Sequence, residues 1–188
     1  MGAWELHLLY ALQGLHCPVL DAVMVAASML GSHALIWLAI SVCLLARRST
    51  RMAGVAVLAA VAAAELAVPL IKGWVMRPRP YMVDRSVALI APAPGGWSFP
   101  SGHATTAFAC AGALAASRGA RRGSARLAVV ASAFLVAFSR LYLFVHWPTD
   151  VLAGAALGLM LGWLAARAVA FVMEGGGRHG GKSATGGA

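Results

Sequence analysis

Long runs of hydrophobic residues, separated by short polar or glycine-rich segments, dominate this sequence of 188 residues. A helix needs about 20 apolar residues to cross the hydrocarbon core of a bilayer. Backbone groups inside a bilayer must be paired within helices or a closed barrel, and runs of this length favour helices. The pattern predicts membrane-spanning helices at about residues 22–46, 52–72, 103–117, 126–145 and 149–172.

The two ends of the sequence depart from this pattern. In residues 1–21, polar side chains such as Glu5 interrupt the apolar ones, which predicts an interfacial helix or an extra, sixth span. Residues 175–188 are rich in glycine and are expected to form a disordered tail, because they bury too little surface to fold. We therefore expect an all-α membrane domain over residues 1–174, a helix bundle of five to six transmembrane helices.

The composition supports a membrane domain. Hydrophobic residues make up 61% of the chain and charged residues 11%, with a mean hydropathy of +0.79, whereas soluble domains are about 25% charged. This excludes a soluble globular enzyme. The net charge of +9 would indicate nucleic-acid binding in a soluble protein. In a membrane protein it indicates topology instead, and we expect no nucleic-acid partner.

Positive residues concentrate on one side of the predicted bundle, in segments 47–51 and 118–126. Because cytoplasmic loops collect Lys and Arg, this side is predicted to face the cytoplasm, in a multi-pass protein of the cytoplasmic (inner) membrane. The opposite, periplasmic or extracellular face also receives cations, which the topology rule does not explain. They are Lys72, Arg77, Arg79, Arg85 and Arg140.

Three polar motifs lie at this second face. Lys72 to Pro80 ends the second predicted span, Pro100 to His103 begins the third, and Ser139 to Asp150 bridges the fourth and fifth. The order of the spans brings all three motifs to the same side of the membrane. We therefore expect residues far apart in the sequence to converge on one site there.

Five residues of these motifs suit an anionic phosphate ester. Its hydrolysis spreads charge over three oxygens, so a catalyst needs fixed donors and cations around them. Lys72, Arg79 and Arg140 supply cations. Ser101 occupies the expected N-cap of a helix, with Gly102 next, so its hydroxyl and the exposed backbone N–H groups there suit an anion. These five are the candidate phosphate-binding residues.

Two histidines and a carboxylate remain for bond making and breaking. Pro148 fits the first position of a helix, which places Asp150 in the first turn within reach of His146. Such a carboxylate fixes the imidazole tautomer and leaves the other nitrogen free to attack phosphorus. His103 is then the candidate general acid. The two histidine roles are interchangeable in principle, and Asp150 favours this assignment. Because cationic side chains supply the positive charge, no metal or other cofactor is expected.

The ordered pattern KxxxxxxRP, PSGH and SRxxxxxHxxxD resembles the type 2 phosphatidic acid phosphatase superfamily of integral-membrane lipid phosphatases, over roughly residues 18–172. Within it, the chain is similar to the branch of undecaprenyl-diphosphate phosphatases and phosphatidylglycerophosphate phosphatases. The resemblance implies a phosphohistidine at His146. It also implies a membrane-embedded substrate that is a lipid phosphate or diphosphate, with undecaprenyl diphosphate expected. A phosphatidate or phosphatidylglycerophosphate phosphatase, a lipid phosphotransferase and a non-catalytic lipid-binding protein are the alternatives.

Two other patterns concern packing. Four aromatic residues near the motifs are interpreted as an interfacial belt, with the edge of a lipid headgroup site as the alternative. They are Trp74, Tyr81, Trp97 and Trp147. Small residues recur every fourth position from Gly154 to Gly162. This spacing predicts close packing against a neighbouring helix, and we assign no oligomeric state from it.

Overall fold

The computed structural model describes residues 2–117 and 123–179, and within these ranges all regular structure is helical. The predicted all-α class is therefore confirmed. Four predicted apolar runs become α4 (Arg51–Val75), α6 (Gly102–Ala116), α7 (Ser124–Tyr142) and α8 (Pro148–His179). The other elements are α1 (Ala3–Gln13), α2 (Pro18–Gly31), η1 (Ser32–Ala34), α3 (Leu35–Leu45) and α5 (Pro80–Val83).

Among the described residues, two helical segments are long and apolar enough to cross a membrane, Arg51–Val83 and Pro148–Met173. The span predicted over residues 22–46 is not one straight helix, because α2 and α3 meet at η1 with a bend of 58°. Ala34 adopts a left-handed backbone conformation with φ of 58°, and a residue in this conformation interrupts an α-helix. The bent pair is a third candidate span, and the total of five to six stays a prediction.

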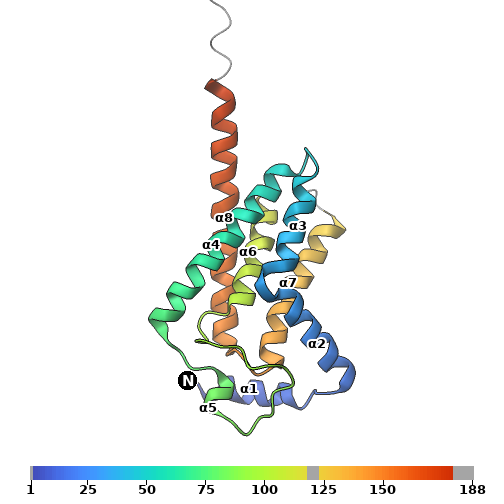
Figure 1. Ribbon diagram of the computed structural model, residues 1–188, viewed down its shortest axis with the longest axis vertical. Coiled ribbons are helices and arrows are strands. Elements are labelled where there is room, and N and C mark those ends of the chain that lie inside the picture. The colour runs from blue at the N-terminus through green and yellow to red at the C-terminus, as the bar shows by residue number, and fades with distance from the viewer. Residues whose placement is uncertain (1, 118–122, 180–188) are drawn as a thin grey trace, which may run out of the picture.

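The ends of the chain also differ from the helices between them. α1 lies across the lower end of the bundle (Figure 1), and its 11 residues rise only about 16 Å, too short to cross a bilayer alone. Gly175 to His179 were expected to form the start of a disordered tail, but they continue α8. Extending an existing helix costs less than starting one. Residues 180–188 lie outside the described part of the chain.

α6 is the central helix of the bundle. All residues from 104 to 114 are buried, with α4, α7 and α8 packed around them (Figure 1). The start of α6 therefore lies in the middle of the lower end, where α7 ends and α8 begins. This arrangement brings the three polar motifs together.

The predicted close helix packing is found between α8 and α6. A Cβ atom added at Gly158 would lie 2.2 Å from the carbonyl oxygen of Thr105, and one at Gly154 would lie 2.7 Å from that of Ser101. Each distance is shorter than a van der Waals contact. The close approach lets the amide of Ser101 donate to the carbonyl of Asp150 at 3.0 Å, which joins two of the motifs directly.

We predict that Gly158→Ala lowers the free energy of unfolding by about 1–3 kcal/mol, because the new methyl group forces α8 away from α6. Thermal unfolding in detergent measures this loss. Gly73→Ala in α4 is the matched control, since a Cβ there meets nothing within 4 Å and alanine favours a helix by up to about 1 kcal/mol. Equal melting temperatures for the two variants would contradict the packing described.

Candidate functional site

His146 occupies the turn between α7 and α8 and is buried. Its Nε2 lies 3.0 Å from Nη1 of Arg79, and because a guanidinium only donates, this nitrogen must be the unprotonated acceptor. Nδ1 therefore carries the proton, and it lies 3.5 Å from Oδ2 of Asp150 and 3.4 Å from Oγ of Ser98. The nitrogen lone pair thus points toward a fixed cation, an arrangement suited to attack on a bound anion.

The surroundings of His146 favour its neutral form. Burial lowers the pKa of His146 well below its usual value, the hydrogen bond with Asp150 opposes this, and the nearby charges of Arg79, Arg140 and Lys72 lower the pKa further. Side chains from two of the motifs, Lys72–Pro80 and Ser139–Asp150, therefore act on one imidazole. A neutral imidazole at neutral pH keeps Nε2 available as a nucleophile.

Asp150 is fully buried, and its carboxylate is held from several sides. Oδ2 accepts a hydrogen bond from the backbone amide of Trp147 at 2.9 Å and another from the hydroxyl of Ser98. Oδ1 accepts from Nη1 of Arg77 at 2.7 Å. These donors stabilise the charged carboxylate and fix its orientation toward His146.

Arg77 connects this carboxylate to helix α1. Its Nη2 donates to Oε2 of Glu5 at 2.8 Å, and Glu5 is only 3% exposed. Oε1 of Glu5 accepts from the hydroxyl of Thr149 at 2.7 Å. Burial raises the pKa of Glu5, but the hydrogen bonds from Thr149 and the charge of Arg77 outweigh it and hold the pKa below its usual value. α1 is therefore tied to the start of α8 beside the site.

Arg79 organises the loop that follows it. Besides His146, its guanidinium donates to the carbonyl oxygens of Gly95 and Gly96 at 2.9 Å each and of Val145 at 3.0 Å. Every one of these partners lies in a connection between helices. Arg79 is 4% exposed, so one buried cation joins the loop to the turn that carries His146.

Lys72, on the last turns of α4, lies at the same loop. Its Nζ donates to the carbonyl oxygens of Trp97 and Ser98, the latter at 3.3 Å. The ammonium group interacts electrostatically with Arg79, Asp150 and Arg140. Lys72 therefore belongs to the same electrostatic cluster as His146.

His103 and Arg140 form a second part of the site, next to α2. Nε2 of His103 lies 3.2 Å from the carbonyl oxygen of Ser28 and 3.3 Å from the hydroxyl of Ser32. Nη1 of Arg140 contacts the hydroxyl of the same Ser28. Nε of Arg140 is buried without a hydrogen-bond partner among the described residues. A buried donor of this kind is costly unless a ligand satisfies it.

Ser101 and Gly102 lie where the sequence predicted them, at the beginning of α6. Ser101 is the N-cap, and its Oγ accepts from the amide of Ala104 at 3.5 Å. Gly102 is the first residue of the helix. The first turn of α6 leaves backbone N–H groups without intrahelical partners, which gives this point a positive electrostatic character.

Three contributors to the site were missed by the sequence-based prediction, namely Glu5, Arg77 and Ser98. Arg77 was noticed as an unexplained cation, but nothing local indicated its partner. Glu5 carried one usable signal, since it is a lone acid in an apolar segment. The interpretation of Trp147 as part of an interfacial belt was wrong, because its side chain is fully buried. The centre of its ring lies 5.2 Å from Cζ of Arg77.

A model of the PAP2 superfamily matches residues 53–174. The undecaprenyl-diphosphatase of Sulfolobus acidocaldarius is 30% identical over 145 residues, covering 77% of this chain and 68% of that protein. The decaprenylphosphoryl-5-phosphoribose phosphatase of Mycolicibacterium smegmatis is 39% identical over 133 residues, covering 69% and 68%. The crystal structure of Aquifex aeolicus LpxE superposes with a TM-score of 0.76 at 28% identity, covering 88% of this chain and 96% of that one.

Proposed function

The chain belongs to the PAP2 superfamily, and from this premise we propose that it is a metal-independent membrane lipid phosphatase that works through a phosphohistidine on His146. One observation carries the proposal. Nε2 of His146 lies 3.0 Å from the guanidinium of Arg79, while Nδ1 faces Asp150. The nucleophilic nitrogen and a cation for the phosphate group are thus held next to each other.

In the first step, the terminal phosphate displaces Nη1 of Arg79 from Nε2 of His146. A phosphate oxygen then accepts the hydrogen bond that Nη1 donated to this nitrogen. Nε2 of His146 then attacks phosphorus, and the bond between phosphorus and the leaving oxygen breaks. His103 donates a proton to that oxygen as general acid. Asp150 stabilises the positive charge that develops on the imidazole and keeps Nδ1 protonated.

In the second step, water attacks the phosphohistidine. His103, now neutral, accepts a proton from the water, the bond between nitrogen and phosphorus breaks, and inorganic phosphate leaves. His103 and His146 return to their starting states. The reaction consumes one water and yields the dephosphorylated lipid and phosphate.

The phosphate-binding residues in this proposal are Lys72, Arg79, Ser101, Gly102 and Arg140. The transition state carries its charge on three equatorial oxygens, which fixed cations and N–H donors stabilise. The unpartnered Nε of Arg140 supports its assignment, because a phosphate oxygen would satisfy that donor. The start of α6 supports the assignment of Ser101 and Gly102.

We propose undecaprenyl diphosphate as the substrate, with undecaprenyl phosphate as the product. The relatives from S. acidocaldarius and M. smegmatis have names that specify polyprenyl lipids, which supports a long isoprenoid tail. Phosphatidate or phosphatidylglycerophosphate hydrolysis and lipid phosphotransfer use the same residues and are the competing activities. A non-catalytic lipid-binding protein would not need the pairing of His146 with Asp150.

The site is proposed to face the periplasm or extracellular side of the cytoplasmic membrane. Arg47 and Arg48, between α3 and α4, and Arg51, the first residue of α4, lie at the other end of the bundle. Positive residues concentrate in cytoplasmic connections, which supports this orientation. The lipid tail then stays in the outer leaflet while the phosphate reaches the cationic site.

The test is phosphate release by the purified protein in detergent with EDTA present, from undecaprenyl diphosphate, phosphatidate and phosphatidylglycerophosphate. We expect release in the presence of EDTA, because the cationic side chains supply the charge that a metal ion would otherwise provide. Among the three lipids, we expect the fastest release from undecaprenyl diphosphate.

Faster release from either glycerolipid would replace the proposed substrate and retain the phosphatase. Release abolished by EDTA and restored by a divalent ion would contradict metal independence. No release from any lipid by folded protein, but transfer of phosphate to an added lipid acceptor, would make the protein a phosphotransferase.

A further inference from the structure

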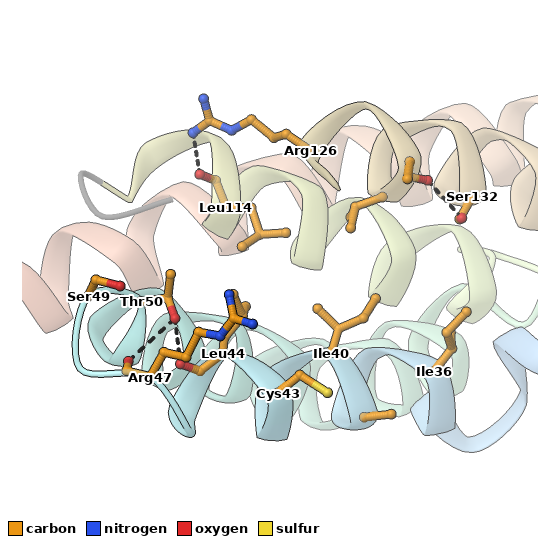
Figure 2. A pocket seen from close by; sticks show the side chains of 13 residues that line it. Ile36, Ile40, Cys43, Leu44, Arg47, Ser49, Thr50, Leu114, Arg126 and Ser132 are labelled. Carbon is orange, nitrogen blue, oxygen red and sulfur yellow. Dashed lines mark hydrogen bonds between the residues drawn. The ribbon is translucent and has the colours of Figure 1, made fainter. Parts of the chain in front are cut away.

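An apolar groove lies at the end of the bundle opposite the candidate site. It has a volume of about 830 Å³, and its lining comes from α3, α7 and the end of α6 (Figure 2). α3 packs mainly against α4, whereas α7 packs against α6 and α2. α3 and α7 thus leave an open trough, with Leu114 of α6 on one side of it.

Both charged residues of the lining lie at one end of the groove. Ile36, Ala39 and Ile40 lie along α3, and Arg47 lies just beyond the end of that helix. Figure 2 shows Arg47 and Arg126 at the same end of the groove, on opposite walls. The described lining residues include these two cations and no acidic side chain. The groove is therefore suited to an amphiphile with an anionic head.

Arg126 has unused hydrogen-bonding capacity at this end. Its Nη2 donates to the carbonyl oxygens of Leu114 and Ala115, the latter at 2.6 Å, at the end of α6. Its Nε is buried without a hydrogen-bond partner among the described residues. A phosphate oxygen that reaches this nitrogen would satisfy the donor, and Arg47 adds a second cation on the opposite wall at the same end.

The length of the groove matches one leaflet of a bilayer. From Ile36 to Arg47 it follows α3 for about 16 Å at 1.5 Å per residue. The hydrocarbon part of one leaflet is about 15 Å thick. One acyl chain laid along the apolar wall would thus place its headgroup phosphate at the level of the two arginines.

We propose that this groove binds an anionic glycerophospholipid from the leaflet opposite the candidate site, with an acyl chain between α3 and α7 and the phosphate at Arg47 and Arg126. The site is separate from the proposed catalytic one, because it lies where α3 and α6 end and α7 begins. Basic pockets between membrane helices suit anionic headgroups. The bound lipid would fill the gap between two helices that do not pack closely on each other.

Two cysteines of the chain allow a direct test. Cys43 lines the groove one helical turn before Arg47, and Cys17 is exposed between α1 and α2, away from it. The full-length protein is placed in nanodiscs of phosphatidylcholine, with or without phosphatidylglycerol, and treated with N-ethylmaleimide. Mass spectrometry then gives the labelling rate of each thiol in the same sample.

We expect phosphatidylglycerol to slow labelling of Cys43 by about fivefold, the effect of one contact between a cation and an anionic lipid, and to leave Cys17 unchanged. Arg47→Gln should remove this protection, whereas Arg48→Gln, which changes a neighbouring cation outside the groove lining, should retain it. Equal labelling of Cys43 in both lipids, or protection that survives Arg47→Gln, would overturn the proposal.

A second measurement decides the case in which Cys43 reacts in neither lipid. The proposal then requires phosphatidylglycerol to raise the melting temperature of the wild type more than that of Arg47→Gln. Equal shifts in the two proteins would overturn it. Protection that depends on protein concentration rather than on lipid charge would instead assign the groove to a second copy of the chain. Phosphate release does not enter either readout, so the lipid site and the proposed function can fail separately.

Discussion

His146→Ala is expected to lower the rate of phosphate release by about 10⁴-fold or more, the size of loss seen when a covalent nucleophile is removed. The reason is that Nε2 of His146 is the atom that accepts the phosphoryl group in the proposed first step. This nitrogen lies 3.0 Å from the guanidinium of Arg79, which supplies positive charge for the phosphoryl group. Single-turnover phosphate release from undecaprenyl diphosphate measures the loss.

His7→Ala is the matched control, because His7 lies on the exposed side of α1 and outside the site. It should keep the wild-type rate within about twofold, as surface substitutions away from a site do. Circular dichroism and the melting temperature establish that the His146 variant is folded. A folded His146→Ala protein with a tenth or more of the wild-type rate would contradict the assigned nucleophile.

Asp150→Asn should lower kcat by about 10³- to 10⁴-fold with little change in KM, as expected for a group that acts in the transition state. An amide cannot accept from Ser98, Trp147 and Arg77 at both ends, since one end is a donor. The NH₂ group would therefore face a donor where the carboxylate offers an acceptor. This repulsion would rotate the imidazole or break the contact with Arg77. The developing charge on His146 would also lose its counter-charge.

Asp21→Asn provides a matched control for Asp150→Asn, because Asp21 also pairs with a histidine. Its Oδ1 lies 2.8 Å from Nδ1 of His16, outside the cationic cluster. This variant should retain kcat within about threefold and change mainly the melting temperature. Equal losses of kcat in the two aspartate variants would mean that Asp150 acts on the stability of the fold rather than on the reaction.

The parts of the site that the sequence revealed depend on local rules. Ser101 was predicted as an N-cap, and the structure has it there, because capping involves only the first residues of a helix. Pro148 likewise begins α8, which brings Asp150 within one turn of His146. Order along the chain and alternating helix direction then bring the motifs to one end, so their convergence was also predictable.

The parts that the sequence did not reveal depend on contacts between distant segments. Glu5 and Arg77 are 72 positions apart, and only the docking of α1 brings them together. Trp147 was assigned to an interfacial belt because its position near a span end is the same in a belt and in a core. Its burial depends on α1, whose Leu9 packs against it.

The bend between α2 and α3 was not predictable from hydropathy. The segment contains no proline between Val19 and Leu45. The polar residues at the bend, Ser32 and His33, are too few to divide the apolar run, so hydropathy indicates one helix. Ala34 adopts a left-handed conformation at the end of η1, and α7 and α6 pack closely there, because a Cβ added at Gly31 would lie 2.6 Å from Val136 and 3.0 Å from His103. The total number of spans depends on such breaks and for that reason remains a prediction.

Trapping of the phosphoenzyme tests the central claim most directly. The protein is mixed with undecaprenyl diphosphate labelled with ³²P at the terminal phosphate, quenched in alkali within one turnover, digested and mapped by mass spectrometry. The account predicts label on the peptide that contains His146, stable in alkali and lost in acid, as expected for a phosphorus–nitrogen bond. Label on another residue, or fast release of phosphate with no labelled protein at any time, would contradict a phosphohistidine at His146.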